Sequence, residues 1–234
     1  MNKPAVLYED NHLFVLCKPP AMPVVPDSSY DYSLLDWGKD YIKRTKNKPG
    51  NVFLAVVHRI DRPVSGLVLF AKTSKAASRL SDQMRRLFIL KKYLAVVSGY
   101  PGSDEGTVET FLKKDRKRNK VAVVSHDTVG AKKAVTRWRV LGRQGDLSLL
   151  CLEPVTGRSH QLRVHMSEML RCPILGDIKY GSNTPVLSGR GIALHSWLMD
   201  IRHPTRKEPV RFACPVPTHD PFALFNVSGR ITGS

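Results

Sequence analysis

One carboxylate lies where its surroundings could make it reactive. Asp61 sits in a polar loop between two strongly apolar runs, with Arg59 and Arg62 on either side and His58 just before them. Adjacent cations favour the ionised form of a carboxylate, so we expect Asp61 to carry its charge at neutral pH. From these residues alone, a structural ion pair at a strand end is the simpler interpretation, and a reactive carboxylate is the alternative.

The sequence offers little support for a metal or a nucleotide cofactor. His160 and His165 are five residues apart, which departs from the i, i+4 spacing of two ligands on one helical face. No carboxylate partner accompanies them, and neither a phosphate-binding glycine loop nor a dinucleotide fingerprint occurs. Ser65 and Ser159 lack the context of a nucleophile elbow. We therefore expect no metal site and no cofactor.

The strands and the helix around the Asp61 loop must position it. The apolar runs 52–57 and 67–71 predict two strands, and Pro63 and Gly66 make the segment between them a loop. Thr73 or Ser74 can cap the helix that follows. The apolar face of this helix keeps the 3.6-residue period at Ala77, Leu80, Met84 and Leu87.

The remaining elements are short. Further strands are expected at 5–8, 13–17, 92–97, 134–141 and 147–152, and helices at 34–42 and 161–170. The segment Lys113 to Lys120 carries six basic residues in eight, and we expect a hydrophilic excursion between strands there. Without a repeat or linker, this mixture favours one α+β domain with a mixed, largely antiparallel sheet. We expect it to cover residues 1–227, with 228–234 as a flexible tail.

The charge balance points to an anionic partner. The chain has 37 Lys and Arg against 20 Asp and Glu, a net charge of +17. Such an excess attracts a polyanion by releasing its condensed counterions, so nucleic acid is a reasonable partner and an anionic membrane surface is a weaker alternative. The apolar runs are too short to span a bilayer, and the first residues do not form a signal peptide. We expect a soluble, cytoplasmic protein.

The four cysteines show no paired spacing. Cys17, Cys151, Cys172 and Cys214 are far apart in sequence, which argues against a zinc ribbon or a redox motif. Each has apolar or proline neighbours. We expect all four to fill core or sub-core space, in keeping with a reduced intracellular compartment.

Several segments together resemble the RluA-type family of RNA pseudouridine synthases. The loop 58–66, HRIDRPVSG, resembles the family signature around its catalytic aspartate. The segments 15–22, 92–95 and 156–165 resemble the lysine-proline, tyrosine and arginine motifs, and 173–177 with Tyr180-Gly181 follows at the usual distance. The resemblance extends, in order, over nearly the whole chain.

The resemblance implies a catalytic domain with a central RNA-binding cleft and a set of site residues. Asp61 would be the nucleophile, Arg163 its ionic partner, and Tyr93 a group that stacks on the target base and takes part in proton transfer. Leu162 would shield the base from water, and Arg59 would fill the space of a flipped nucleotide. His58 and Arg62, beside these residues in the loop, are further substrate-binding candidates. The partner would be structured ribosomal or transfer RNA.

Departures from the family and competing functions qualify this expectation. The first motif begins within the first twenty residues, so we expect no accessory RNA-binding domain ahead of it. A non-catalytic RNA-binding or ribosome-assembly factor on the same fold is the main alternative, and a metal-dependent nuclease is a third. The run 113–120 would contact phosphates or remain a solvated loop. We expect a monomer, and no DNA or membrane partner.

Overall fold

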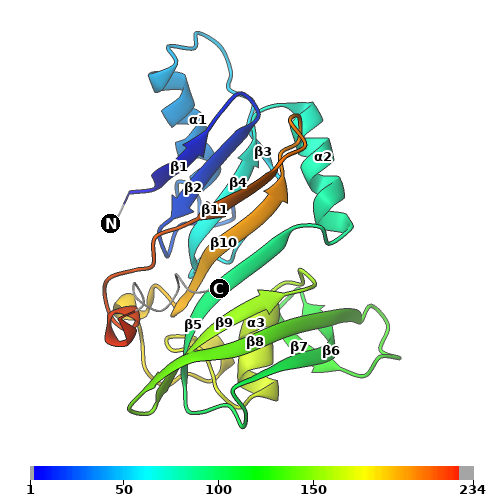
Figure 1. The fold of residues 1–234 in the computed structure, drawn as a ribbon, viewed down its shortest axis with the longest axis vertical. Coiled ribbons are helices and arrows are strands. Elements are labelled where there is room, and N and C mark those ends of the chain that lie inside the picture. The colour runs from blue at the N-terminus through cyan, green and yellow to red at the C-terminus, as the bar shows by residue number, and fades with distance from the viewer. Residues whose placement is uncertain (1–2, 227–234) are drawn as a thin grey trace. The chain divides into compact units, whose positions relative to one another are not determined.

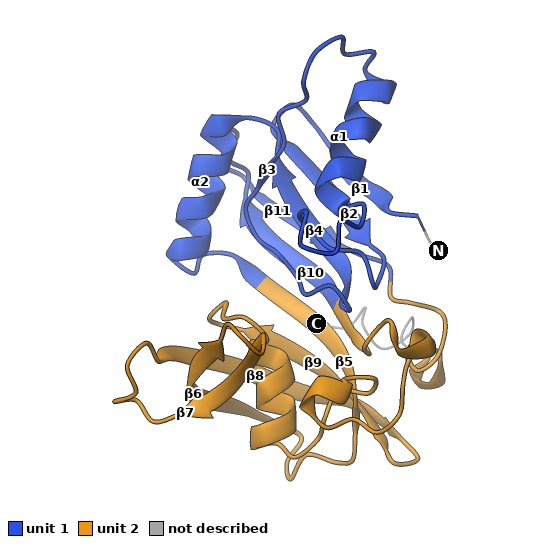
Figure 2. Cartoon of the chain, turned by 180° about the vertical axis from the view of Figure 1, so that it is seen from behind, with its two compact units in different colours: residues 1–90, 196–215 blue, residues 91–195, 216–234 orange. Residues whose placement is uncertain are grey.

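A computed structural model describes residues 3–226 as two compact units (Figures 1 and 2). Unit 1 comprises residues 1–90 and 196–215, and unit 2 comprises residues 91–195 and 216–234. Both units are therefore discontinuous in sequence. The predicted α+β class with a largely antiparallel sheet is confirmed. The predicted domain boundary at residue 227, and the tail at 228–234, lie outside the described residues.

Unit 1 is built on a set of antiparallel strands. Strand β2 pairs with β1 and β4, β3 pairs with β4, and β10 pairs with β11. The strands are β1 (Ala5–Glu9), β2 (Leu13–Lys18), β3 (Ala55–Val56), β4 (Ser65–Ala71), β10 (Leu194–Arg202) and β11 (Pro209–Ala213). Strands β4 and β10 are neighbours. The Asp61 loop thus leaves β3 and enters β4, the strand at the centre of this unit.

Two helices cover opposite faces of the unit 1 strands (Figure 1). Helix α1 (Leu34–Thr45) packs against alternate residues of β2, as its Gly38 lies next to Phe14 and Leu16. Helix α2 (Ser74–Arg85) joins a buried cluster that contains the intervening β2 residues, Leu13 and Val15. Successive side chains of a strand point to opposite faces, so each helix buries one face.

Helix α2 begins as its sequence predicts. The Thr73 side chain accepts a hydrogen bond from the Ala76 backbone N–H at 3.2 Å, which satisfies one free donor of the first turn. Leu80 is fully buried on the inner face, a burial that contributes about 1.5–3 kcal/mol. Leu87, in contrast, follows the end of the helix and is 52 % exposed, so its predicted place on the apolar face is wrong.

Unit 2 contains a five-stranded antiparallel array in the order β5-β9-β8-β6-β7. The strands are β5 (Leu90–Ser98), β6 (Glu105–Asp115), β7 (Lys120–Val124), β8 (Lys132–Gln144) and β9 (Leu147–Pro154). Helix α3 (Gln161–Val164) contacts β7, β8 and β9 and continues into a π-helical turn, η1 (His165–Met169). Short 3-10 turns follow at η2 (Ile178–Tyr180), η3 (Leu187–Gly189) and η4 (Phe222–Phe225).

Three local expectations need correction. The apolar run 52–57 forms a strand only at Ala55–Val56, and Phe53 is 53 % exposed. Apolar composition without regular alternation does not by itself establish a strand. The basic segment 113–120 lies in a hairpin of β6 and β7, strands that we did not predict. Cys17 and Cys214 form a disulfide, so the expectation of reduced cysteines is wrong for this pair, whereas Cys151 and Cys172 are free.

No helix among residues 3–226 is long and apolar enough to cross a membrane.

Substitution of Gly66 tests how closely β4 packs against β10. Its φ is +111°, and a Cβ at this position would lie 2.2 Å from the Ser196 carbonyl oxygen of β10. We expect Gly66→Ala to lower the free energy of unfolding by about 2–4 kcal/mol, because both the conformation and the space exclude a side chain. Urea denaturation measures the effect. Gly50→Ala is the control, since no atom lies within 4 Å of its added Cβ. Equal losses of unfolding free energy in the two variants would contradict the close approach of Gly66 to β10.

Candidate active site

The Asp61 loop is held by one hydrogen bond to β4 and by another within its own turn. The Asp61 carbonyl oxygen accepts a 3.0 Å hydrogen bond from the Val64 backbone N–H, which closes a tight turn. His58 accepts a 2.9 Å hydrogen bond at Nε2 from the Leu69 backbone N–H, which ties the start of the loop to β4. Asp61 itself is half-buried. The loop therefore presents its carboxylate from a defined backbone rather than from a free segment.

The buried Lys18 side chain also holds this loop in place. The end of β2 places its ammonium in the interior, where Nζ donates to the carbonyl oxygens of Pro19, Met22 and Arg62 at 2.8–3.0 Å. These three acceptors match the three donors of an ammonium. Burial lowers the pKa of Lys18 to about 7, the charge of Asp61 opposes this shift, and Arg62 adds to it. The Lys18 amine is thus held next to the loop, in electrostatic contact with Asp61, and is charged in about half of the molecules at pH 7.

The two arginines of the loop have different surroundings. Arg62 donates to the Ala21 carbonyl oxygen at 3.0 Å and to Ser29 Oγ at 2.8 Å, and it pairs with Asp31. These contacts join the Asp61 loop to the segment 21–31, of which only residues 26–31 are exposed. Arg59 is exposed to solvent. Its predicted role in filling the space of a flipped base, and the predicted substrate contacts of Arg62 and His58, stay predictions.

Unit 2 supplies the other predicted site residues. Tyr93 lies on β5 opposite Leu152 of β9 and is 8 % exposed. Leu162 lies on α3 and is 7 % exposed. Both are therefore mostly buried side chains on regular elements, where packing fixes their rotamers.

Arg163 takes part in a buried two-point ion pair. Its Nε lies 2.7 Å from Asp177 Oδ2 and its Nη2 lies 2.8 Å from Asp177 Oδ1. The side chains are 7 % and 0 % exposed, respectively. The guanidinium also lies over the Tyr180 ring, 5.0 Å from its centroid. This fork geometry fixes the guanidinium plane, because both N–H···O bonds must stay aligned.

The roles of three residues were missed from the sequence. Asp177 and Tyr180 occur in segments that carry only the family resemblance, and Lys18 occurs in the segment 15–22 that resembles the lysine-proline motif. A signal existed for Asp177, because a carboxylate follows the apolar run 173–176 at a tight bend. Lys18 gave a weaker one, a cation directly after five apolar residues. Neither signal indicates which backbone or charge would be the partner.

His165, one of the two histidines considered as metal ligands, is buried and hydrogen-bonded through both ring nitrogens. Its Nε2 lies 2.9 Å from Thr110 Oγ1 and its Nδ1 lies 2.9 Å from Thr136 Oγ1. Both ring nitrogens thus join η1 to strands β6 and β8. Burial lowers the pKa of His165 to about 4, so the ring is neutral at pH 7. His160 instead hydrogen-bonds the Tyr180 hydroxyl through Nδ1 at 2.7 Å.

Comparison with known proteins places these residues in a family. The RNA pseudouridylate synthase family profile matches residues 12–168, which include the Lys18, Asp61, Tyr93 and Arg163 segments. The chain belongs to the RNA pseudouridylate synthase family. The predicted resemblance is therefore confirmed, across segments of both units.

Individual members of the pseudouridylate synthase family match most of the chain. A ribosomal large subunit pseudouridine synthase D from Borreliella burgdorferi is 37 % identical over 84 % of this chain, and the chain spans 60 % of that protein. An uncharacterized RNA pseudouridine synthase from Zymomonas mobilis is 32 % identical, covering 91 % of this chain and 93 % of that protein. Among solved structures, human RNA Pseudouridylate Synthase Domain Containing 4 has a TM-score of 0.75 at 26 % identity, covering 91 % of this chain and 88 % of that one.

The Arg163–Asp177 pair can be tested against a matched pair on the surface. Arg211 and Asp200 form the same two-point fork, at 2.7 and 2.8 Å, but both are partly exposed. We expect Asp177→Asn to lower the free energy of unfolding by about 2–4 kcal/mol, because a buried cation loses its counter-charge. Asp200→Asn should cost less than about 1 kcal/mol. Urea denaturation of both variants measures these losses. Equal losses of unfolding free energy would show that burial does not make the Arg163–Asp177 pair more important for stability than the exposed pair.

His165 predicts a loss of stability at acid pH. An unfolded histidine titrates near 6.5, so between pH 6.5 and 4 the unfolded chain binds more protons than the folded chain. The free energy of unfolding should fall through this window as the pH is lowered, by about 3 kcal/mol for this group at pH 4.

The test is to measure the free energy of unfolding by urea denaturation at pH 7 and at pH 4, for the unmodified protein and for two histidine variants. His165→Gln should lose about 3 kcal/mol less than the unmodified protein between the two values. His219→Gln, at an exposed position, should lose as much as the unmodified protein. An equal loss of unfolding free energy in His165→Gln and in the unmodified protein would show that this histidine does not cause the acid sensitivity.

Proposed function

We propose that this protein isomerises uridine to pseudouridine in structured RNA, with Asp61 as the nucleophile. The observation that supports the proposal most is the setting of Asp61. Asp61 is half-buried on a loop that is held by a hydrogen bond within its turn and by another to β4, with the buried Lys18 amine in electrostatic contact. A carboxylate held in position on an ordered loop is able to act as a nucleophile in covalent catalysis, which supports the proposal.

The proposed reaction is a rearrangement and needs no added reactant. The bond between N1 of uracil and C1′ of ribose breaks, and a bond between C5 and C1′ forms. The C5 proton is released, and N1 gains a proton. Asp61 attacks either the uracil ring or the anomeric carbon, and both routes pass through a covalent intermediate that divides one hard step into two. No redox or phosphoryl group is involved, so no cofactor is proposed.

Other residues of the proposed site have separate tasks. Arg163, with its plane fixed by Asp177, would pair with Asp61 and keep the nucleophile ionised. Tyr93 would stack on the target base and take part in the proton transfer. Leu162 would pack against the base and exclude water.

The proposed substrate is ribosomal or transfer RNA. A paired uridine hides its reactive atoms, so the nucleotide must leave the stack, at a cost of about a few kcal/mol. Arg59, which is exposed, would occupy the vacated space, and His58 and Arg62 would contribute further contacts. The names of several relatives, such as the B. burgdorferi synthase, favour large-subunit ribosomal RNA. We further propose a cytoplasmic monomer without a DNA or membrane partner.

The decisive measurement is tritium release from RNA labelled at C5 of uridine. The C5 proton leaves only when that carbon becomes the new attachment point. We expect release by the unmodified protein, and a loss of at least about 10³-fold in Asp61→Ala. Asp146→Asn, an exposed carboxylate in the β8–β9 turn, should release tritium at the unmodified rate.

The same assay distinguishes the proposed enzyme from the main alternative, a non-catalytic RNA-binding protein. A protein that binds RNA but releases no tritium from unmodified ribosomal and transfer RNA would be a non-catalytic RNA-binding or assembly factor on this fold. Undiminished release by Asp61→Ala would assign the nucleophile elsewhere.

A further inference from the structure

A groove in unit 1 lies between helix α2 and the turn that joins β10 to β11, two parts of the fold that lie side by side (Figure 1). Its volume is about 500 Å³, which is within the size range of ligand sites. Four of its lining residues are Arg or Lys, and one, Asp82, is acidic. The cations are Arg79 and Arg85 of α2, Arg202 at the end of β10, and Lys207 in the turn. The groove is therefore strongly cationic.

Hydrogen bonds join the two walls of the groove. Gln83 of α2 donates through Nε2 to the Arg202 carbonyl oxygen at 2.8 Å, and its Oε1 accepts from the Arg202 backbone N–H at 2.9 Å. Arg79 donates through Nη1 to the Pro204 carbonyl oxygen at 2.5 Å. These bonds fix the separation of the helix and the turn. The groove is thus preformed, so a ligand would bind with little ordering of its walls.

The turn is held from inside by His203, which is 1 % exposed. Its Nδ1 accepts from the backbone N–H groups of Thr205 and Arg206 at 3.3 and 3.1 Å, and its Nε2 lies 2.8 Å from Asp10 Oδ2. An imidazole that accepts at Nδ1 carries its proton on Nε2, so Nε2 donates to Asp10. The wall that carries Lys207 therefore has an ordered backbone.

Three of the four cations are left without an acidic partner. Asp82 is already engaged, because it pairs with Arg85 of the same helix at 2.6 Å. Among residues 3–226, no carboxylate oxygen lies within 4.0 Å of a side-chain nitrogen of Arg79, Arg202 or Lys207. Like charges that line one groove repel one another and together attract an anion.

The groove lies at the end of β4 opposite to the Asp61 loop. That loop enters β4 at Ser65. Directly after the other end of β4, Lys72 donates to the Asp10 carbonyl oxygen, and Asp10 in turn binds His203. A strand of seven residues extends about 20 Å. A ligand in the groove is therefore well separated from the carboxylate of Asp61.

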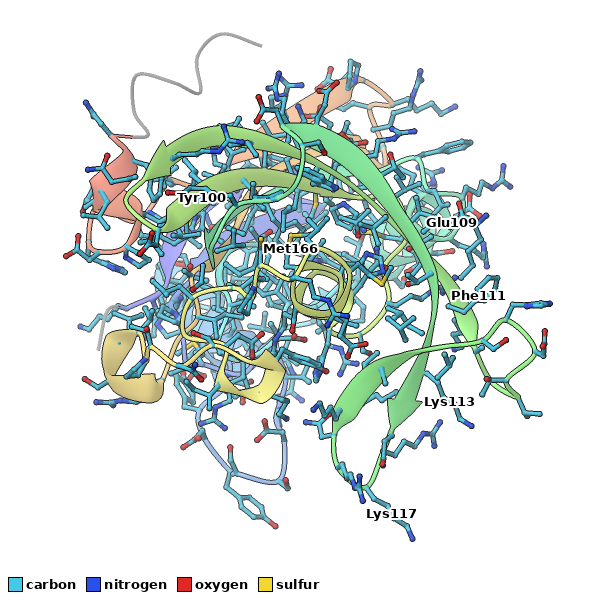
Figure 3. All side chains as sticks on the ribbon, turned by 90° about the horizontal axis from the view of Figure 1, so that it is seen from below. Tyr100, Glu109, Phe111, Lys113, Lys117 and Met166 are labelled. Atoms are coloured by element: carbon cyan, nitrogen blue, oxygen red, sulfur yellow. A yellow bond between two sulfur atoms is a disulfide. The ribbon has the colours of Figure 1, made fainter. Side chains whose placement is uncertain are left out.

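The groove is also distinct from the basic run 113–120. That run belongs to the β6–β7 hairpin of unit 2, where Figure 3 shows Lys113 and Lys117. All residues that line the groove belong to unit 1. Each unit thus carries a cationic surface of its own.

The composition of the groove indicates which kind of anion it takes. Its nine lining residues include no Phe, Tyr or Trp, and Pro204 is the only apolar one. Sites for small organic ligands are lined mostly by apolar and aromatic groups, which would hold a base or another ring. Arg and Lys side chains without such groups suit phosphates. Several of them along one groove match the linked phosphates of a polynucleotide backbone.

We propose that this groove binds successive phosphates of the RNA substrate, at a distance from the nucleotide that is modified. The inference rests on the proposed function for the identity of the polyanion. Phosphate contacts contribute affinity and fix the orientation of the RNA without reading its base sequence. The groove would thus hold a segment of structured RNA that extends past the target uridine.

The test compares two double variants of equal charge change. The groove variant combines Arg202→Gln with Lys207→Gln, both exposed positions. The control combines Arg44→Gln with Lys48→Gln, two exposed residues at the end of α1 and just after it. Binding of an in vitro transcript of large-subunit ribosomal RNA is measured from 50 to 300 mM KCl, and turnover is measured by tritium release. Thermal melting establishes that the variants are folded.

We expect the groove variant to bind the transcript about 10-fold more weakly at low salt, and its slope of log K against log salt to flatten by about 2. The control should keep the unmodified slope to within about 0.5. Arg202→Lys combined with Lys207→Arg keeps both charges and should restore most of the affinity. At saturating RNA the groove variant should retain kcat and show a raised KM, because the lost contacts are made before and at the transition state alike.

Inorganic tripolyphosphate separates RNA from a free oligophosphate as the ligand. It is added to the unmodified protein and to the groove variant, and the melting temperatures are compared. A ligand that binds the folded state raises the melting temperature. A rise in the unmodified protein alone, with the same RNA affinity in both proteins, would assign the groove to a free oligophosphate and overturn the RNA contact.

Three further results would overturn the proposal. These are equal losses of RNA affinity in the two double variants, an unchanged salt slope in the groove variant, and absence of RNA binding by the unmodified protein. Failure of the proposed function looks different, because RNA binding would then depend on the groove while no protein releases tritium. Binding and turnover therefore test the two proposals separately.

Discussion

The buried ion pair between Arg163 and Asp177 is the constraint on which the organisation of unit 2 depends. Two opposite charges have been removed from water there, and only a near-ideal geometry compensates for the desolvation. That geometry requires α3 and the bend at 176–177 to keep a fixed separation. The Tyr180 ring lies against the same guanidinium, and its hydroxyl binds the base of the β6–β7 hairpin. One pair of charges thus connects a helix, a turn and a hairpin.

Unit 1 uses a buried charge in a comparable way. Lys18 ties together backbone oxygens from the segment just after β2 and from the Asp61 loop. Apolar packing alone does not fix such loops, because they present backbone polar groups that must find partners. A cation with three donors satisfies several of them at once. Both units therefore position their candidate site residues through buried polar contacts, whereas the apolar clusters position the strands and helices behind them.

The sequence indicated the elements well where one face is regularly apolar. Strands β2 and β4 and the cap of α2 follow directly from alternation, periodicity and the threonine before the helix. Strand β6 was missed although Val108, Thr110 and Leu112 alternate with exposed neighbours, because charged residues at its end dominated the pattern. The predicted strand at 52–57 is too long, since apolar composition without alternation does not establish a strand.

The candidate site was predictable only in part. The segments around Asp61, Tyr93 and Arg163 were identified by their resemblance to a family, which the family profile bears out. Their supporting partners were not, because Asp177 lies 14 residues from Arg163 and Lys18 lies 44 residues from Arg62. The Cys17–Cys214 bond spans 197 residues, and no local pattern predicts such a pairing. Contacts of this kind depend on the completed fold.

The short helix α3 illustrates how the fold determines the direction of one side chain. Four residues are too few for a helix to be stable alone, so tertiary contacts must hold it. The Gln161 amide does so on one side, donating to the Val135 carbonyl oxygen and accepting from the Thr156 hydroxyl. His165 does so at the other end, between two threonine hydroxyls. Arg163 lies midway between these two anchors, so rotation of the helix about its axis is blocked. The direction of its guanidinium is then set by satisfied polar groups, which tolerate less displacement than apolar contacts would.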